Sequence, residues 1–349
     1  MSAKFSIDGR AVGPGEKSYL IAEIAQAHDG SLGYAHAFID LAKDCGADAV
    51  KFQTHIAREE TTREEDFRVR IFPQDKTRYE YWQRMEFEPD QWQGLKNHAD
   101  EVGITFLSSA FSHKAIDLLD RIGMPAWKVA SGEVLNFSLL EAMCATGKPV
   151  LLSSGMSAMD EVDQAIKFVQ EQGNPAGIFQ CTTKYPTPLE ETGLNVMQDF
   201  ATQYGIPVGL SDHSANPYVP IVAMSKGADM IETHLCLHPR QFGPDTSSSL
   251  TPEGFKMMSE ARDVAHVVLN NKVEKDAMSK DLNVVRGLFQ KSLALREDQA
   301  AGTVLSEDMI TLKKPGTGLP ASRLQSLVGK TLTQDVSHER LLRDEDVTE

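Results

Sequence analysis

A repeated unit dominates the chain: an amphipathic run, then a glycine, then a short apolar strand that ends in polar residues. The phrases GADAVKF and GADMIETH show this unit almost verbatim at two distant points. Strands that alternate with helices form parallel sheets. Eight such units most simply close into an α/β (β/α)8 barrel, also called a TIM barrel, with a doubly wound open sheet as the alternative. The predicted strands are Tyr19–Ile24, Ala49–Thr54, Thr105–Ser109, Ala126–Ala130, Val150–Ser154, Ile178–Thr182, Val208–Asp212 and Met230–His234.

Two segments fall outside the repeat. Residues 4–17 contain glycine-rich turns and predict a hairpin or plug ahead of the first strand. Residues 55–88 form a long, charged and aromatic insertion after the second strand, and such a loop is usually functional or a covering lid. Among the helix signals, Ser157 with Asp160 predicts a capping box, and Thr251-Pro252 predicts the start of the last barrel helix.

The pattern changes after about residue 270, where a polar stretch is followed by short strand-like pieces such as KSLALRE and MITLKKPGTGL. We therefore predict a catalytic barrel with its N-terminal hairpin over residues 1–271, a linker over 272–285, and a small mixed α+β domain over 286–349. A domain of ~60 residues is close to the size at which a core alone is marginal, so we expect it to lean on a partner surface.

Charge and composition exclude several classes of function. The formal net charge of −15 argues against a nucleic-acid or anionic-membrane partner, because both need a basic surface. The sequence has no apolar stretch of membrane-spanning length, and its first residues lack the apolar core of a signal peptide, so a cytoplasmic location is expected. The cysteines are scattered without CxxC spacing and are interpreted as small buried apolar residues: Cys45, Cys144, Cys181 and Cys236.

Polar side chains follow the predicted strands at their C-terminal ends, where the loops of such a barrel converge and where its chemistry is found. Because eight strand ends meet at one face, we expect these side chains to lie near one another. They are Glu23, Lys51, Gln53, Ser108, Ser109, Lys128, Ser131, Ser153, Ser154, Thr182, Thr183, Tyr185, Ser211, Asp212, His213, Glu232, Thr233 and His234.

Two lysines in this set, Lys51 and Lys128, point into the predicted barrel and need anionic partners, since an unpaired buried ammonium is costly. Internal salt bridges to Glu23 and to Asp212 or Glu232 are one way to provide them. The alternative is a bound anion, because the surrounding serines and threonines can bind phosphate and carboxylate oxygens without adding charge. Phosphoenolpyruvate carries both groups.

His213 and His234 follow adjacent predicted strands at matching height. Two imidazoles so placed could hold a divalent metal in an open site that water or substrate completes. A purely structural role for both is the alternative. His28 follows the first strand, and we expect it to line the same face.

Many phrases in the chain occur in the order found in one enzyme family. They are AEIAQAHDGS, GADAVKFQT, FLSSAFS, WKVASGE, LLSSGM, CTTKYPTP, GLSDHS, ETHL and FGPD. In these the chain resembles the N-acetylneuraminate (sialic acid) synthases, and KSLALRE through VGKTL resembles that family's C-terminal SAF (antifreeze-like) domain. The resemblance covers nearly the whole chain and favours the barrel over the open sheet.

The resemblance implies a divalent-metal-dependent condensation of phosphoenolpyruvate with N-acetylmannosamine or a related amino sugar. It implies Mn2+ or Mg2+ at His213 and His234, and a homodimer in which the SAF domain of one subunit reaches the barrel of the other. Glu23, Lys51 and Lys128 are the implied catalytic residues. The implied substrate-binding residues are Lys51, Gln53, Ser109, Lys128, Ser131, Ser153, Thr183, Tyr185, Ser211, Asp245 and Lys314.

The chain departs from the family pattern on the side that would face the sugar, at Ala27, Thr183, Thr233, Thr246 and Lys314. An arginine fork and a lysine point charge do not recognise an N-acyl group equally. The reaction type is therefore expected more firmly than the acceptor, and a legionaminic-type diacetamido sugar is an alternative.

Three other functions compete with this interpretation. The related deoxy-octulosonate and deoxy-heptulosonate phosphate synthases would need extra arginines for a phosphosugar, and candidates lie in the insertion at Arg58, Arg63, Arg68 and Arg70. A metal-dependent barrel hydrolase would show closely spaced histidines on the first strand, which this chain lacks. A non-catalytic carbohydrate- or ice-binding protein would not need two lysines inside a barrel.

Overall fold

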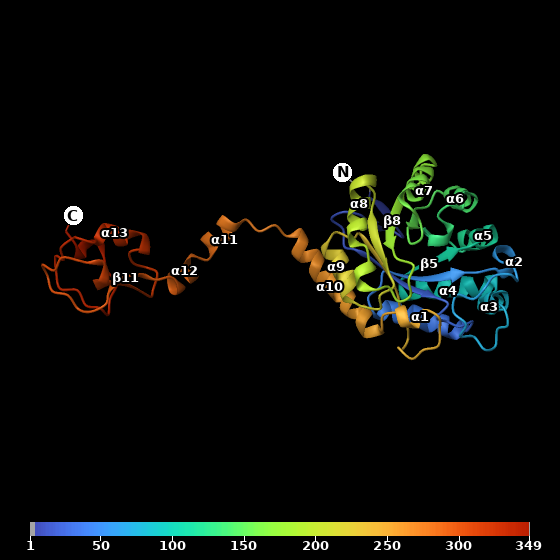
Figure 1. Cartoon of the computed structure of the whole chain (residues 1–349), viewed down its shortest axis with the longest axis horizontal. Helices are drawn as coiled ribbons and strands as arrows, with labels where there is room; N and C mark the ends of the chain where they lie inside the picture. Colours follow the sequence, from blue (N-terminus) through green and yellow to red (C-terminus); the bar gives the residue numbers. More distant parts are fainter. Residues whose placement is uncertain (1–3, 349) are drawn as a thin grey trace. The chain divides into compact units, whose positions relative to one another are not determined.

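A computed structural model describes residues 4–348. Its main feature is a closed barrel of parallel strands, paired in sequence order from β3 to β10, with β10 closing onto β3 (Figure 1). The predicted (β/α)8 barrel is confirmed, and the open sheet is wrong because the two outer strands pair. The strands are β3 (Tyr19–Ala25), β4 (Ala49–Thr54), β5 (Thr105–Ala110), β6 (Trp127–Val129), β7 (Val150–Ser153), β8 (Ala176–Cys181), β9 (Val208–Asp212) and β10 (Met230–His234).

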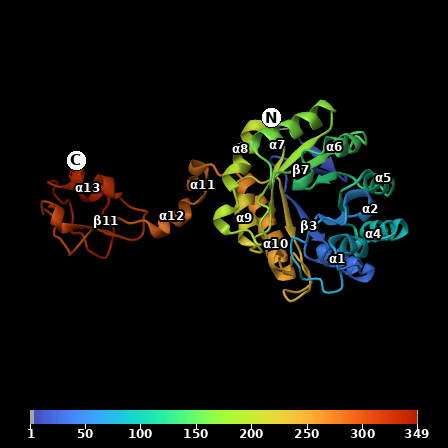
Figure 2. The same cartoon turned by 45° about the vertical axis from the view of Figure 1, so that its right-hand side comes forward.

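Helices surround the strands, as Figures 1 and 2 show, and their buried faces are apolar. On α7, for example, Val162, Ala165, Ile166 and Val169 are buried at the helical spacing that places them on one face. The exterior helices are α1 (Leu32–Asp44), α4 (Pro89–Val102), α5 (His113–Arg121), α6 (Phe137–Cys144), α7 (Met159–Glu171), α8 (Leu194–Tyr204), α9 (Tyr218–Ser225) and α10 (Pro252–Asn270).

The predicted ends of the helices and strands agree with the structure at some positions and differ at others. Thr251 caps α10, because its hydroxyl oxygen accepts a hydrogen bond from Gly254 N at 3.2 Å. The capping box predicted at Ser157 and Asp160 is wrong: the N-cap of α7 is Ala158, one residue later, and Glu161 accepts from Ala158 N at 2.7 Å. The strand predicted at 126–130 is only three residues long, because Ser131 already begins a 3-10 turn.

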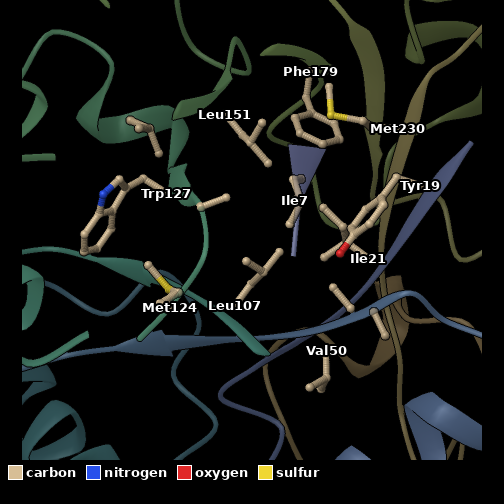
Figure 3. Packing of buried hydrophobic residues seen from close by; sticks show 14 of the residues in the cluster. Ile7, Tyr19, Ile21, Val50, Leu107, Met124, Trp127, Leu151, Phe179 and Met230 are labelled. Carbon is tan, nitrogen blue, oxygen red and sulfur yellow. The ribbon is translucent and has the colours of Figure 1, made fainter. Parts of the chain in front are cut away.

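A hairpin closes the barrel at the N-terminal end of its strands. Strands β1 (Phe5–Ile7) and β2 (Arg10–Val12) pair antiparallel around a turn with positive φ at Asp8 and Gly9. Figure 3 shows Ile7 among barrel side chains such as Tyr19 and Leu151, and Ile7 is fully buried. The predicted plug is thus part of the hydrophobic core, and it fills the end of the barrel opposite the strand exits.

The insertion over residues 55–88 contains two helices, α2 (Ala57–Glu60) and α3 (Arg78–Met85). It has a small hydrophobic cluster of its own, made of Ala57, Phe72, Tyr81, Trp82 and Met85. Thr77 and Glu80 form a capping box that fixes the start of α3. The insertion is therefore an ordered cover rather than a loose loop.

A second compact unit begins at Asn271. Its strands β11 (Ser292–Leu295) and β12 (Ile310–Lys313) pair antiparallel over a separate core that includes Leu293, Leu305 and Leu332. The stretch predicted as a linker contains α11 (Lys275–Asp281) and leads into α12 (Asn283–Phe289), neither of which has a buried residue. A further short helix, α13, spans Leu324–Leu327.

Within residues 4–348, no helix combines the length and the apolar character needed to cross a membrane.

The hairpin yields a stability prediction. Replacing Ile7 with alanine should lower the free energy of unfolding by about 2–4 kcal/mol, because it leaves a cavity in a closed core. Ser6→Ala, on the exposed side of the same strand, should change it by less than about 0.5 kcal/mol. Urea denaturation followed by circular dichroism measures both, and equal effects would show that the hairpin is not part of the cooperative core.

Candidate active site

The C-terminal ends of the barrel strands surround a cavity of about 510 Å³. The structure brings twelve of the predicted site residues together in its lining. They are Glu23, Lys51, Gln53, Ser109, Lys128, Ser131, Ser153, Thr183, Tyr185, Ser211, His213 and His234.

The alternation of side chains along each strand decides which residues reach this cavity. On β4, Lys51 and Gln53 point into it, while Phe52 between them packs in the hydrophobic core. On β10, Glu232 and His234 line the cavity, while Thr233 is buried outside its lining. Two-residue periodicity thus separates the charged residues of the site from the residues that support the fold.

Four buried charges form the floor of the cavity. Lys51 Nζ lies 2.5 Å from Glu23 Oε2 and 3.7 Å from Glu232 Oε2. Lys128 Nζ lies 3.5 Å from Glu232 Oε1. The internal salt bridges considered from the sequence therefore exist, and Glu232 rather than Asp212 is the shared carboxylate. Asp212 instead accepts hydrogen bonds from the hydroxyl and backbone N–H of Ser214.

Burial and mutual attraction shift the pKa values of these groups in different directions. Burial raises the pKa of Glu23, whereas the attraction of Lys128 and Lys51 outweighs burial and lowers the pKa of Glu232 to about 2. Burial lowers the pKa of Lys128, while Glu23 and Glu232 outweigh burial and raise the pKa of Lys51. Glu232 is thus the permanent anion of the cluster, and Glu23 is the carboxyl group that takes up a proton more readily.

Hydroxyl groups surround the two ammonium groups. Lys51 donates to Ser109 at 3.3 Å, Lys128 donates to Ser153, and Ser211 donates to Glu232 at 3.0 Å. Ser131 accepts from Gly155 N at 3.1 Å. Two cations and four hydroxyls in a buried space can bind several oxygens of one anion without adding a further charge.

His213 and His234 lie side by side in the wall, with ring centroids 5.3 Å apart. His213 Nδ1 is 3.1 Å from the carbonyl oxygen of Thr182, so the ring donates there and keeps its Nε2 lone pair. Burial, and then the proximity of His234, lowers the pKa of His213 to about 4, so the ring is neutral at pH 7. A neutral imidazole oriented by a carbonyl is the usual state of a metal-binding histidine.

The pair fits an open divalent-metal site and not a closed one. Among residues 4–348, no group of three or more His, Cys, Asp or Glu residues is placed to hold a metal ion. Two imidazoles would therefore be the contribution of these residues, and water or substrate oxygens would complete the shell.

A second cavity of about 370 Å³ shares seven lining residues with the first: Gln53, Arg78, Trp82, Met156, Thr183, Tyr185 and His234. Its remaining wall comes largely from the insertion and includes the predicted residue Asp245. The Arg68 guanidinium pairs with Asp245 at 2.5 Å and lies 4.3 Å from the centre of the Tyr185 ring. The second cavity thus extends the first toward the cover, and its lining is more aromatic.

Several lining residues were not predicted from the sequence. They come from the insertion and from the loop after β5: His55, Glu60, Glu65, Arg78, Trp82 and Phe111. The aromatic and charged composition of the insertion indicated a functional cover. It did not indicate which of its side chains would face the cavity.

Other expectations need correction. His28 does not line the cavity: it is fully buried and packs against Phe87 at a ring distance of 4.8 Å. Of the departures in the described part of the barrel, only Thr183 lines either cavity, because Ala27, Thr233 and Thr246 lie outside both linings. Lys314 belongs to the second unit, where its Nζ lies 5.1 Å from the centre of the Phe289 ring.

Two known protein families match the two parts of this chain. The NeuB family matches residues 38–274, and the SAF domain matches residues 290–348. The chain belongs to the NeuB family. The predicted sialic acid synthase family and its SAF domain are confirmed, and with them the prediction of a phosphoenolpyruvate-dependent synthase.

Relatives with different products resemble this NeuB protein to nearly the same degree. It is 30% identical to the N,N'-diacetyllegionaminic acid synthase of Campylobacter jejuni, over 94% of this chain and 100% of that protein. It is 32% identical to the human N-acetylneuraminate-9-phosphate synthase, over 97% of this chain and 94% of that protein. The crystal structure of the N-acetylneuraminic acid synthetase from Leptospira borgpetersenii, in complex with citrate, matches with a TM-score of 0.72 and 26% identity. That match covers 82% of this chain and 98% of the other.

The charge cluster predicts a strong coupling between Lys51 and Glu23. Lys51→Met should cost about 3–5 kcal/mol of unfolding free energy, because it leaves carboxylates without their buried partner. Glu23→Gln in the Lys51→Met background should recover at least about 1 kcal/mol relative to the sum of the single changes. Urea titrations of the four proteins measure this coupling, and strictly additive effects would contradict a direct ion pair.

Proposed function

We propose that this NeuB protein condenses phosphoenolpyruvate with the open-chain aldehyde of an unphosphorylated N-acylated amino sugar, giving a nonulosonic acid and inorganic phosphate. One observation carries the proposal: two buried lysines with a ring of hydroxyls and two adjacent imidazoles line the same cavity. The first set suits an enol phosphate, and the second suits a metal-assisted carbonyl group.

In this proposal, Lys51 and Lys128 hold phosphoenolpyruvate at the cavity floor together with Ser109, Ser131, Ser153 and Ser211. The ligand has to share these lysines with Glu23 and Glu232, which pair with them in the structure. The hydroxyls complete the shell of the phosphate and carboxylate oxygens. A buried, preformed cationic site of this kind binds charge without having to reorganise water.

His213 and His234 would hold Mn2+ or Mg2+, and when bound there the ion would supply polarisation of the aldehyde carbonyl. The enol carbon of phosphoenolpyruvate forms the new C–C bond to the aldehyde carbon, whose oxygen becomes a hydroxyl. Water adds to the phosphate-bearing carbon, and Glu23 takes up its proton. The raised pKa of Glu23 supports this role, because a carboxylate is a better base when its pKa is higher.

The resulting tetrahedral centre expels phosphate by cleavage of the C–O bond: the phosphate leaves with the electron pair, and the hydroxyl that came from water loses its proton as it becomes the keto oxygen. Of the two protons of that water, one passes through Glu23 to the former aldehyde oxygen and the other goes to the departing phosphate. Lys51 and Lys128 stabilise the charge that develops on the departing oxygen. Loss of one preorganised donor of this kind costs roughly 2.7–4 kcal/mol of barrier.

The arginines near the acceptor are already paired with carboxylates, which favours an unphosphorylated acceptor. Within the described chain, the arginines that line the two cavities are Arg68 and Arg78, which pair with Asp245 at 2.5 Å and with Glu65 at 3.1 Å. A phosphosugar would need cations that are free to bind its phosphate. The aromatic and apolar wall of the second cavity suits N-acyl groups, which leaves both N-acetylmannosamine and a legionaminic-type diacetamido sugar as acceptors.

Gln53, Thr183, Tyr185 and Asp245 would face this sugar from the barrel. We further propose a homodimer in which Lys314 from the SAF domain of the partner subunit completes the sugar site. The polar sugar requires donors and acceptors on several sides, and the small SAF domain would gain a supporting surface from the exchange.

Phosphate release across a panel of acceptors tests the proposed function. With phosphoenolpyruvate and Mn2+, free N-acetylmannosamine or a free diacetamido hexose should support release at least tenfold faster than its 6-phosphate, because the arginines near the acceptor are already paired. Faster release with phosphosugars, such as arabinose 5-phosphate or erythrose 4-phosphate, would favour the rival synthases. Absence of release with every acceptor would contradict the proposal.

The metal role makes a separate prediction. His213→Ala should abolish turnover and weaken Mn2+ binding at least tenfold, measured by electron paramagnetic resonance of free Mn2+, while the melting temperature stays within a few degrees. His266→Ala, on α10 and outside both cavities, is the matched control and should bind Mn2+ normally. Near wild-type activity of His213→Ala at saturating Mn2+ would refute the role.

A further inference from the structure

His55 lines the first cavity but has no role in the reaction proposed above. It follows β4 directly, and its ring lies between Trp82, 3.8 Å away by ring centroids, and Phe111, 4.3 Å away. The interplanar angles are 20° and 9°, so both neighbours stack on its faces. The ring is buried, and it lines the first cavity. Its plane is therefore fixed, and only its two nitrogens are left to interact in that plane.

Both nitrogens have polar partners. His55 Nδ1 lies 2.5 Å from Glu60 Oε1, and His55 Nε2 lies 3.3 Å from Gln53 Oε1. The amide nitrogen of Gln53 then donates to Glu23 Oε1 at 3.1 Å. A continuous hydrogen-bonded row thus runs from the short helix α2 in the insertion to Glu23, which pairs with Lys51.

The carboxylates at the two ends fix the direction of every hydrogen bond in the row. A carboxylate only accepts, so Gln53 has to present its NH2 group to Glu23 and its oxygen to His55. Glu60 accepts from His55 Nδ1, and its second oxygen accepts from Ile56 N at 3.3 Å. His55 Nδ1 thus faces the Glu60 carboxylate and His55 Nε2 faces the Gln53 oxygen, so each contact of the ring is to an acceptor oxygen.

We propose that His55 is a positioning residue that holds the Gln53 amide in the orientation that donates to Glu23. This inference rests on the proposed function, in which Glu23 takes up the proton of the attacking water. Without the N–H of His55 Nε2, the Gln53 oxygen loses its donor, and the contact to Glu23 alone holds the NH2 end of the amide in place. An amide held at one end rotates more easily, and the carboxylate then lacks a donor in a fixed direction.

Three substitutions separate this role from simple packing. His55→Phe keeps an aromatic ring between Trp82 and Phe111 but removes both hydrogen bonds. His55→Gln keeps a donor near the position of Nε2, and His55→Asn keeps one near Nδ1. Loss of one hydrogen bond in a buried site corresponds to roughly a tenfold effect. We therefore expect kcat to fall about tenfold in His55→Phe and His55→Asn, with the KM for phosphoenolpyruvate within about twofold.

His55→Gln should recover most of kcat, because it retains the contact to Gln53. Recovery by His55→Asn instead would overturn the inference, since it would place the function in the contact to Glu60. Full activity of His55→Phe would overturn it as well, since stacking alone would then suffice. His113→Gln, on the exposed side of α5, is the matched control and should leave kcat unchanged.

A double-mutant cycle asks whether His55 acts through Gln53. In a Gln53→Leu background, His55→Phe should lower kcat by less than about twofold, because the amide that it positions is gone. A full tenfold loss in that background would contradict the mechanism. Wild-type phosphate release is measured first: its absence would refute the proposed function, whereas normal wild-type release with additive variants would refute only the role of His55. Melting temperatures identify any variant that fails to fold.

Discussion

The site depends on the stabilisation of two buried positive charges: the ammonium groups of two lysines lie inside the barrel, nearly out of contact with solvent. Lys51 and Lys128 are stable there only because Glu23 and Glu232 reach the same floor from β3 and β10. Barrel closure is what brings these strands together, since β10 pairs with β3 through Glu232↔Ile21 and His234↔Glu23. The charge pairs of the site therefore require the correct pairing of the barrel strands. A barrel with a misplaced strand would leave a buried charge without its partner.

Much of this arrangement could be predicted from the sequence, because it follows from periodicity. The repeat located all eight strands, and Lys51, Lys128 and His234 stand at their exits. The same alternation would have excluded Thr233 from the sugar-facing residues, since Glu232 and His234 on either side of it both point inward. By contrast, His55 and Trp82 become neighbours only when the insertion folds, and no spacing in the sequence encodes that contact. The start of α7 was missed because Glu161, rather than Asp160, reaches back to the N-cap, where it accepts from Ala158 N.

The difference between predictable and unpredictable residues follows the two halves of the proposed reaction. Residues on strands, which would grip the enol phosphate, are fixed by hydrogen-bonded register. Residues that would face the sugar lie mainly on the insertion and on loops, where Arg68 and Asp245 are distant in sequence but paired in space. Loops carried by a rigid barrel can change without disturbing the floor. This agrees with the presence of synthases for different acids among relatives of nearly equal identity.

The hairpin beneath the barrel also has a kinetic consequence. Because Ile7 and its neighbours fill the opposite end of the barrel, substrates reach the cavity from the face where the strands end. Phosphoenolpyruvate, which would bind at the floor of the cavity, would then bind before the sugar. The phosphate formed at the floor would leave after the nonulosonic acid above it. Under the proposed function, entry from one face of the barrel therefore favours a sequential order of binding and release, although the chemistry alone would allow either order.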